Sequence, residues 1–296
     1  MSVKINKAFS GSWVALITPM DEQGKVDFED LRKLVSWHIE AGTTGLVILG
    51  TTAEAVTLSE QEQLDVLNTV IDENKSRLPI VVGNGSNCTQ TTIDKTKQLD
   101  GLDIQGYLTV TPYYNKPTQK GMVAHFKAVA AVTDKPIILY NVPGRTCVDL
   151  SNEAVIELAK IDNIVGIKDA TADLSRVAVL RENTNDFLLF SGDDFSSIEY
   201  LELGGDGVIS VTANVEPAKL AKLVDACLAG LSDKAKEINN KLLALHQDLF
   251  IEPNPVPTKW ALQQKGLIKS DAVRLPLLKM EPNNHSVVKQ ALEQAK

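Results

Sequence analysis

The chain has 296 residues, 44% of them hydrophobic, and a formal net charge of −8 at pH 7. This length fits one large α/β barrel or two ordinary domains. The negative charge argues against binding to nucleic acid or to an anionic membrane surface. The one apolar run near the N-terminus, residues 13–17, is too short for a signal peptide or a membrane span.

Short apolar runs alternate with helix-compatible stretches along most of the chain. The runs that predict strands are residues 12–18, 46–50, 79–83, 107–111, 136–141, 164–169, 187–191 and 208–211. The clearest predicted helices are 28–40, 59–73, a helix from about 90, 119–132, 152–160 and 174–183. The second helix opens with a capping-box pattern, Ser59 followed by Glu62.

Most of the strand runs do not alternate between apolar and polar residues, which indicates burial on both faces of a parallel sheet. Eight β-α units in about the first 230 residues predict an α/β fold, a closed (β/α)₈ TIM barrel. A doubly wound open sheet is the alternative fold. It would want a glycine-rich phosphate loop after the first strand, and residues 18–21 do not form one.

After Gly230 the β-α rhythm stops. Residues 234–251 and 287–294 predict helices, with the proline-rich segment 252–257 between them. We therefore expect a catalytic barrel over residues 1–230 and a C-terminal helical appendage over 231–296 that packs on the barrel.

Lys168 lies near the end of an apolar strand run, where its ammonium cannot stay hydrated. Burial disfavours the charged form, and a neutral amine can attack a ketone to form a Schiff base. The structural alternatives are a lysine paired with a buried carboxylate and one that reaches out to water. The strand alone does not decide between these interpretations.

Barrel enzymes place their active sites at the C-terminal ends of the strands, and this rule selects further residues. Thr51 and Thr52 follow the second strand, where hydroxyls and backbone N–H groups suit a small carboxylate. Tyr140 could move protons to and from a carbinolamine oxygen. Arg145 suits a carboxylate on a second substrate. Helix capping, core packing and a surface ion pair are their respective structural alternatives.

Four motifs, in order and at matching spacing, identify a family resemblance. They are Gly50-Thr51-Thr52-x-Glu54, Val110-Thr111-Pro112-Tyr113-Tyr114-Asn115-Lys116-Pro117, Tyr140-Asn141-Val142-Pro143-Gly144-Arg145-Thr146 and Gly166-Ile167-Lys168-Asp169. Together they resemble the dihydrodipicolinate synthases, which belong with N-acetylneuraminate lyase to the pyruvate-dependent class I aldolases. The resemblance extends from about residue 11 to residue 278.

The resemblance implies a lyase that condenses pyruvate with L-aspartate 4-semialdehyde, in the diaminopimelate branch of lysine biosynthesis. Lys168 would form the Schiff base with pyruvate. Tyr140 would act as general acid and base, linked through Thr51 to Tyr114 in a proton relay. In this family that tyrosine comes from a neighbouring subunit, so a complete site implies a homo-oligomer, either a dimer or a tetramer.

The same resemblance assigns the substrate contacts. Thr51 and Thr52 would hold the pyruvate carboxylate, and Gly192 and Ile209 would line the pocket through their backbones. Arg145 would receive the carboxylate of the semialdehyde. The reaction requires no metal and no organic cofactor, in agreement with histidines and cysteines that show no ligand spacing. Three widely spaced cysteines favour reduced thiols and a cytoplasmic location.

Two features depart from the usual family pattern. Ala53 stands where a glycine commonly follows the two threonines, and it would be strained by about 1 kcal/mol if φ there is positive. Many members also bind lysine in a cleft between subunits, lined partly by a histidine and a glutamate. Because Thr91 offers no charge to the effector, we expect weak or absent inhibition by lysine. The positions that we align with this cleft are Ala55, Glu60, Gln63, Asn87, Thr91 and Tyr113.

Two other functions remain open at this point. N-acetylneuraminate lyase or a keto-deoxy-sugar-acid aldolase would share Lys168, Tyr140 and the threonines, although Arg145 and the Tyr113-Tyr114 pair favour the synthase. A non-catalytic binding protein on a barrel scaffold would share the fold. The intact set of lysine, tyrosine and threonines argues against it.

Overall fold

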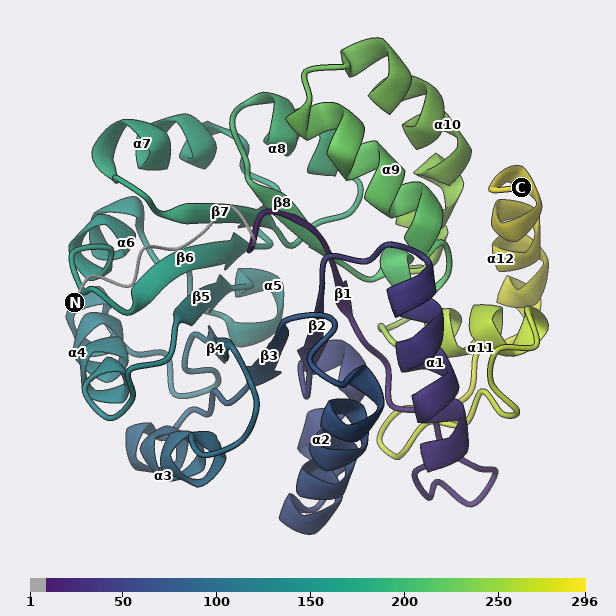
Figure 1. The fold of residues 1–296 in the computed structure, drawn as a ribbon, viewed down its shortest axis with the longest axis horizontal. Coiled ribbons are helices and arrows are strands. Elements are labelled where there is room, and N and C mark those ends of the chain that lie inside the picture. The colour runs from purple at the N-terminus through teal and green to yellow at the C-terminus, as the bar shows by residue number, and fades with distance from the viewer. Residues whose placement is uncertain (1–8) are drawn as a thin grey trace. The chain divides into compact units, whose positions relative to one another are not determined.

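The computed structural model describes residues 9–296 (Figure 1). Within them, eight strands form a closed barrel in sequence order, which confirms the predicted α/β barrel. The pairings between neighbouring strands from β3 to β8, and between β1 and β2, are parallel. The strands are β1 Gly11–Ala15, β2 Gly45–Ile48, β3 Ile80–Gly83, β4 Gly106–Val110, β5 Ile137–Asn141, β6 Ile164–Asp169, β7 Leu188–Ser191 and β8 Gly207–Ser210.

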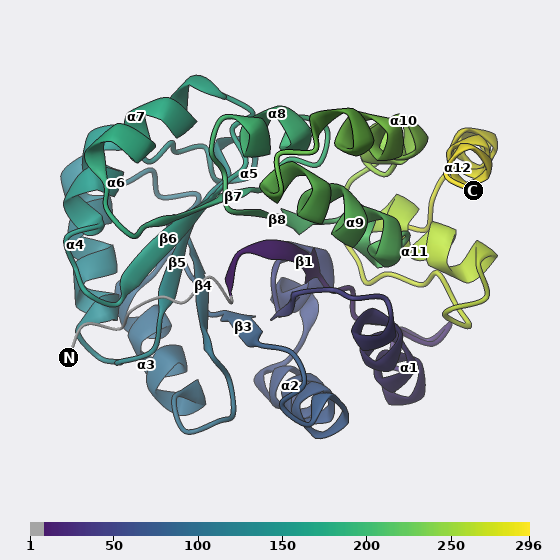
Figure 2. The same ribbon diagram turned by 45° about the horizontal axis from the view of Figure 1, so that its top comes forward.

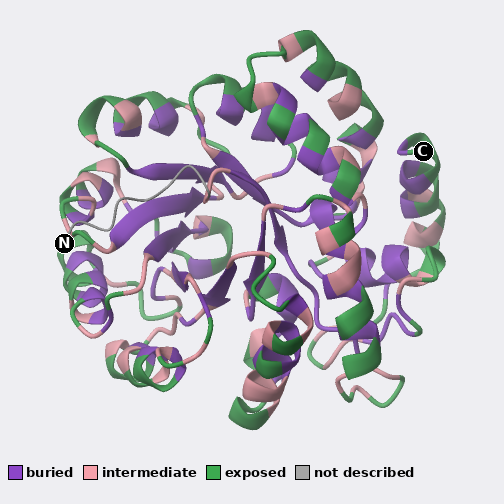
Figure 3. Ribbon diagram, in the orientation of Figure 1, coloured by how far each residue is buried: buried purple, intermediate pink, exposed green. Residues whose placement is uncertain are grey.

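The strands are buried almost without interruption (Figure 3). Every strand residue except Gly83 and Val110 is buried. This is the expectation for parallel strands that are covered on both faces, and it explains why their apolar runs do not alternate.

Twelve α-helices lie within the described residues. They are α1 Phe28–Glu40, α2 Glu60–Asn74, α3 Thr89–Leu99, α4 Gln119–Ala130, α5 Pro143–Thr146, α6 Asn152–Leu158, α7 Ser175–Asn183, α8 Ser197–Glu202, α9 Pro217–Leu228, α10 Ser232–Asp248, α11 Val256–Gln264 and α12 Pro282–Gln294. Four of them, α1, α2, α4 and α6, begin with a side-chain cap. The predicted capping box of α2 is present, with Ser59 and Glu62 bonding reciprocally. Asp27 caps α1 by accepting from the backbone N–H of Asp30.

The chain divides into two compact units. We call residues 80–209, which the contacts group with residues 9 and 10, the central unit. We call residues 11–79 and 210–296 the terminal unit. The predicted domain boundary near residue 230 stays a prediction.

In the central unit, Figure 1 and Figure 2 show β4 to β7 side by side, with α4, α6 and α7 along one side of them. Helix α3 packs on α4, α4 on α6, and α6 on α7. Helices of successive β-α units are therefore neighbours, as the β-α repeat requires.

In the terminal unit, α1 packs on α2 and α9 packs on both β1 and α10. The C-terminal part differs from the prediction at two points. Helix α11 begins inside the proline-rich segment expected as a connection, because Pro257 lies in its first turn, where a missing N–H costs nothing. Helix α12 begins at Pro282, five residues before the predicted start, for the same reason. No helix within residues 9–296 is long and apolar enough to cross a membrane.

Candidate active site

Lys168 is the penultimate residue of β6 and lies beside Tyr140 of β5 in the strand register. Its Nζ atom is 4.5 Å from the centroid of the Tyr140 ring. Both residues are buried, with Lys168 6% exposed and Tyr140 7% exposed. The central unit therefore brings together the amine and the phenol that the sequence predicts as a catalytic pair.

Lys168 fits neither of the two structural alternatives considered for it. Because its side chain is only 6% exposed, it does not reach out to water. Among residues 9–296, the ion pairs and hydrogen bonds include no carboxylate bound to its Nζ atom. Lys168 is therefore a buried lysine without a carboxylate partner among the described residues, and its role as a nucleophile stays a prediction.

The neighbouring carboxylate, Asp169, is engaged elsewhere. Its Oδ2 accepts from Nε of Arg176 at 2.7 Å, and its Oδ1 accepts from the backbone N–H and the hydroxyl of Thr171. Successive side chains of a strand point to opposite faces, so Asp169 faces away from Lys168. The negative charge next to Lys168 in sequence is thereby neutralised by a buried arginine.

Gly192 gives the Lys168 side chain its room. A Cβ atom at Gly192 would lie 2.9 Å from Cε of Lys168 and 2.9 Å from Cβ of Ala170. Real Cβ atoms essentially never approach other atoms so closely, so any larger residue would displace the lysine. The other residue predicted to line the pocket, Ile209, is buried in β8.

Arg145 lies in the short helix α5, directly after β5, and its side chain is exposed. Asn141 holds the segment that follows, because its Nδ2 donates to Asp149 and its Oδ1 accepts from the N–H of Leu150. No ion pair of Arg145 occurs within the described residues, so the surface ion pair considered as its alternative is not formed. The guanidinium is open to a ligand.

Tyr114 projects from the turn after β4. It is 88% exposed and has a φ of 73°, a conformation that costs energy for a bulky residue. Asn115 fixes this turn by donating to the backbone carbonyl of Asn87 at 2.8 Å. Within the central unit, Tyr114 is thus held in the open rather than beside Tyr140.

The threonine turn belongs to the terminal unit. Thr51–Ala53 form a 3₁₀ turn, with Thr51 exposed and Thr52 buried. Ala53 does not have a positive φ, so the strain considered for an alanine does not arise. The left-handed conformation falls on Glu54 instead, with φ 54° and ψ 32°.

Two residues of the C-terminal region hold this turn, and the sequence did not single out a role for either. Asn254 donates from Nδ2 to the hydroxyl oxygen of Thr52 at 2.9 Å. Lys259, which is fully buried, donates to Oε1 of Glu54 at 2.5 Å and to the carbonyl of Ala272 at 2.8 Å. Burial lowers the pKa of the Lys259 ammonium, while Glu54 opposes this effect. The sequence signal that could have indicated this ion pair was the position of a lysine and a glutamate inside apolar stretches.

Arg274 completes the support of the threonine turn. Its backbone N–H donates to Oε2 of Glu54, and its guanidinium pairs with Glu62 and donates to the carbonyls of Thr57 and Gly24. The pairing lowers the pKa of Glu62 to about 2. The same glutamate closes the capping box of α2, so the turn and the helix start share one anchor.

The positions aligned with an effector cleft fall in both units. In the terminal unit, the amide of Gln63 donates to the carbonyls of Ala55 and Leu58, so its donor groups are already used. Glu60 is exposed at the start of α2. In the central unit, Thr91 is exposed, and Asn87 and Tyr113 are partly exposed. Thr91 lies in the first turn of α3, where it lowers the pKa of the Cys88 thiol.

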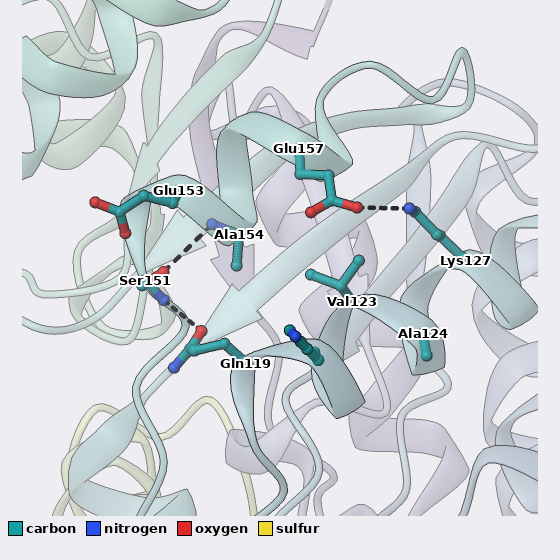
Figure 4. Close-up of a pocket in the computed structure, with 9 residues that line it drawn as sticks. Gln119, Val123, Ala124, Lys127, Ser151, Glu153, Ala154 and Glu157 are labelled. Atoms are coloured by element: carbon teal, nitrogen blue, oxygen red, sulfur yellow. Dashed lines mark hydrogen bonds and ion pairs between the residues drawn. The ribbon is translucent and has the colours of Figure 1, made fainter.

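A pocket of about 460 Å³ between α4 and α6 contains none of these residues (Figure 4). Several polar side chains that line the pocket form hydrogen bonds or ion pairs with neighbouring residues. Gln119 accepts from the backbone N–H of Ser151, and Lys127 pairs with Glu157. It is lined by Gln119, Lys120, Val123, Ala124, Lys127, Ser151, Glu153, Ala154 and Glu157.

The chain is similar to known proteins in both sequence and structure. Residues 8–295 match the model of the dihydrodipicolinate synthetase family. The chain is 48% identical over 285 residues to a protein named 4-hydroxy-tetrahydrodipicolinate synthase from Pseudoalteromonas atlantica, covering 96% of this chain and 97% of that protein.

Two crystal structures extend the comparison. The chloride-inhibited dihydrodipicolinate synthase from Acinetobacter baumannii, complexed with pyruvate, has a TM-score of 0.94 and 47% identity, covering 97% of this chain and 98% of that one. The enzyme from Cyanidioschyzon merolae with lysine bound has a TM-score of 0.94 and 34% identity, with the same two coverages.

Proposed function

Because the chain belongs to the dihydrodipicolinate synthetase family, we propose that it acts as a 4-hydroxy-tetrahydrodipicolinate synthase. In this reaction, pyruvate condenses with L-aspartate 4-semialdehyde through a Schiff base on a lysine. The product belongs to the diaminopimelate branch of lysine biosynthesis. The observation that carries the site assignment is Lys168, buried beside Tyr140 without a carboxylate partner.

The reaction begins with attack of the Lys168 amine on the keto carbon of pyruvate, which gives a carbinolamine. Tyr140 then donates a proton to the departing hydroxyl group, and water leaves as the imine forms. Loss of a methyl proton yields an enamine, whose carbon attacks the aldehyde of the second substrate. The amine of that substrate next attacks the imine carbon, closes the ring and releases Lys168.

Carboxylate recognition is assigned to three polar residues. Thr51 and Thr52 would hold the pyruvate carboxylate with hydroxyl and backbone donors. Arg145 would bind the carboxylate of the semialdehyde, which its exposed and unpaired guanidinium supports. Gly192 and Ile209 would line the pocket, and the close approach at Gly192 supports this role.

The proton relay requires Tyr114 beside Thr51 and Tyr140. We assign this tyrosine to the site of a neighbouring subunit, so the active form is a homo-oligomer, a dimer or a tetramer. Its 88% exposure in a single chain supports this assignment, because an aromatic ring gains by burial against a partner. The reaction needs no metal or organic cofactor, and we place the enzyme in the cytoplasm.

The test is a trapping experiment followed by a substrate comparison. Incubation with pyruvate and borohydride should add a pyruvate-derived mass to the peptide that carries Lys168. Purified enzyme should then turn over pyruvate with aspartate semialdehyde and leave N-acetylneuraminate intact. Trapping on Lys135 or Lys259 would overturn the site, and preferred cleavage of N-acetylneuraminate would favour the alternative aldolase.

A further inference from the structure

Asn254 forms a hydrogen bond to the threonine turn through its Nδ2 atom. Its Nδ2 atom donates to the Thr52 hydroxyl oxygen at 2.9 Å, and the residue is 6% exposed. Its amide oxygen is buried and has no hydrogen-bond partner within the part of the chain that the structure describes. A buried polar atom without a partner is costly, so an apolar side chain of similar size would be the more stable choice if only packing mattered.

The direction of this hydrogen bond has a chemical consequence. A hydroxyl group has one donor hydrogen and two acceptor lone pairs. Asn254 occupies a lone pair of Thr52, and no acceptor for the Thr52 hydroxyl hydrogen occurs among residues 9–296. That hydrogen is therefore available to a bound carboxylate, which can only accept.

We propose that Asn254 is a positioning residue that orients the Thr52 hydroxyl so that it donates to the pyruvate carboxylate. This inference rests on the proposed function and assigns a residue to it. Polarisation by the amide also strengthens the hydroxyl as a donor, since hydrogen bonds in a chain reinforce one another. Asn254 acts through Thr52 and not on the reacting atoms.

The rest of the turn does not depend on Asn254. Glu54 is held separately by Lys259 and by the backbone N–H of Arg274, and Thr18 donates from its hydroxyl to the carbonyl of Ala53 at 2.8 Å. Removal of the amide should therefore leave the backbone of the turn in place. The expected effect is on pyruvate binding rather than on folding.

The experiment measures the pyruvate concentration that gives half-maximal borohydride trapping on Lys168. Asn254→Ala should raise this concentration about tenfold, and Asn254→Asp should raise it further, because a carboxylate accepts the Thr52 hydrogen and repels pyruvate. The KM for the semialdehyde should change less than twofold. Asn239→Ala is the matched control, because the amide oxygen of Asn239 is also buried without a partner but lies in α10.

A double-mutant cycle separates positioning from a purely structural role. In a Thr52→Val background, where no hydroxyl remains to be oriented, Asn254→Ala should have no further effect. Effects that multiply across the two sites, or equal losses for both substrates, would overturn the inference while leaving the Schiff base intact. Failure of the unmodified chain to form a pyruvate adduct would instead overturn the proposed function, and this inference with it.

Discussion

The two lysines that are buried among residues 9–296 occupy opposite environments. Lys259 in the terminal unit is fully buried and paired with Glu54 and with the carbonyl of Ala272. Lys168 in the central unit is 6% exposed and faces the ring of Tyr140, while the adjacent carboxylate is bound to Arg176. Lys259 has carboxylate and carbonyl partners, whereas Lys168 has neither among the described residues.

Burial alone therefore does not make a lysine a nucleophile. A charged amine inside a protein is stabilised when a carboxylate and further acceptors replace its water, as they do at Lys259. Where these partners are withheld, the amine is free to react. This rule can be tested first on the two lysines and then on other cations of the chain and its ligands.

The largest effect is expected for Lys168→Ala. Loss of the proposed nucleophile should lower the turnover rate about a thousandfold or more, because the imine on which the proposed reaction depends can no longer form at this position. The free energy of unfolding should change little, since Lys168 makes no ion pair within the described residues. Turnover assays and urea unfolding measure both quantities. A variant that retained a borohydride-trapped adduct would contradict the assignment.

Lys259→Met should have the opposite effects: a loss of stability and little change in the chemistry at Lys168. It leaves Glu54 as an uncompensated buried charge, which should lower the free energy of unfolding by about 3–5 kcal/mol. The folded fraction should still form the adduct on Lys168. Addition of Glu54→Gln to this variant should recover part of the lost stability, because it removes the unpaired charge. No recovery would mean that shape rather than charge is what Lys259 supplies.

Arg145→Ala extends the comparison to an exposed cation without a partner. Loss of a charge-assisted contact should weaken use of the semialdehyde by about 2 kcal/mol, roughly thirtyfold in kcat/KM. Formation of the pyruvate imine should be almost unchanged, and Lys127→Ala, which removes an exposed cation from α4, is the control. Equal losses in both steps would make Arg145 structural.

Free lysine, bound as an effector, would also need a carboxylate partner for its ammonium group. Its ammonium finds no carboxylate at Thr91, and the missing partner should cost on the order of 1.5–3 kcal/mol, or about tenfold or more in affinity. Turnover against a lysine titration should show weak or absent inhibition, and Thr91→Glu should increase sensitivity. Half-inhibition of the unmodified enzyme at sub-millimolar lysine would sink this prediction.

Two buried histidines allow the effect of burial without a carboxylate partner to be tested on the free energy of unfolding. Burial lowers the pKa of His38 to about 3 and that of His125 to about 4, from 6.5. Because the unfolded chain binds protons first, each histidine should destabilise the fold as pH falls below about 6.5, by about 1.4 kcal/mol per pH unit at most. The loss from each should level off near the folded pKa.

Urea unfolding between pH 7 and pH 5 measures this slope. His38→Asn with His125→Asn should flatten it. Glu62 does not interfere in this range, because its lowered pKa keeps its contribution present above about pH 4.5 and lost only as pH falls toward 2. Equal slopes in both proteins would contradict the prediction.

The barrel could be predicted because its signals are local. The helix at residues 28–40 and the strand at 164–169 coincide with α1 and β6, since apolar spacing and capping residues fix them. Helix α11 was missed because a proline-rich stretch indicates a loop unless the prolines are recognised as first-turn residues. The choice between a loop and a helix start depends on tertiary packing, which cannot be inferred from a short stretch of sequence.

The candidate site residues could be predicted from the sequence, but the residues that hold them in place could not. Lys168 follows from its strand and its motif, whereas the roles of Asn254 and Lys259 depend on contacts with residues more than 200 positions away. The expected strain at Ala53 did not arise, because the turn places its left-handed residue at Glu54. Spacing along a chain does not report which residue of a turn takes that conformation.

The hydrogen bonds that hold the threonine turn have a consequence for folding during synthesis of the chain on the ribosome. Thr52 and Glu54 lie 202, 205 and 220 residues before the groups that bind them in Asn254, Lys259 and Arg274. At 5–20 residues per second, a ribosome needs about 10–40 s to make the intervening chain. During this time the Glu54 carboxylate must stay in water, so the nascent chain cannot complete the hydrogen bonds of the threonine turn before residues 254–274 emerge.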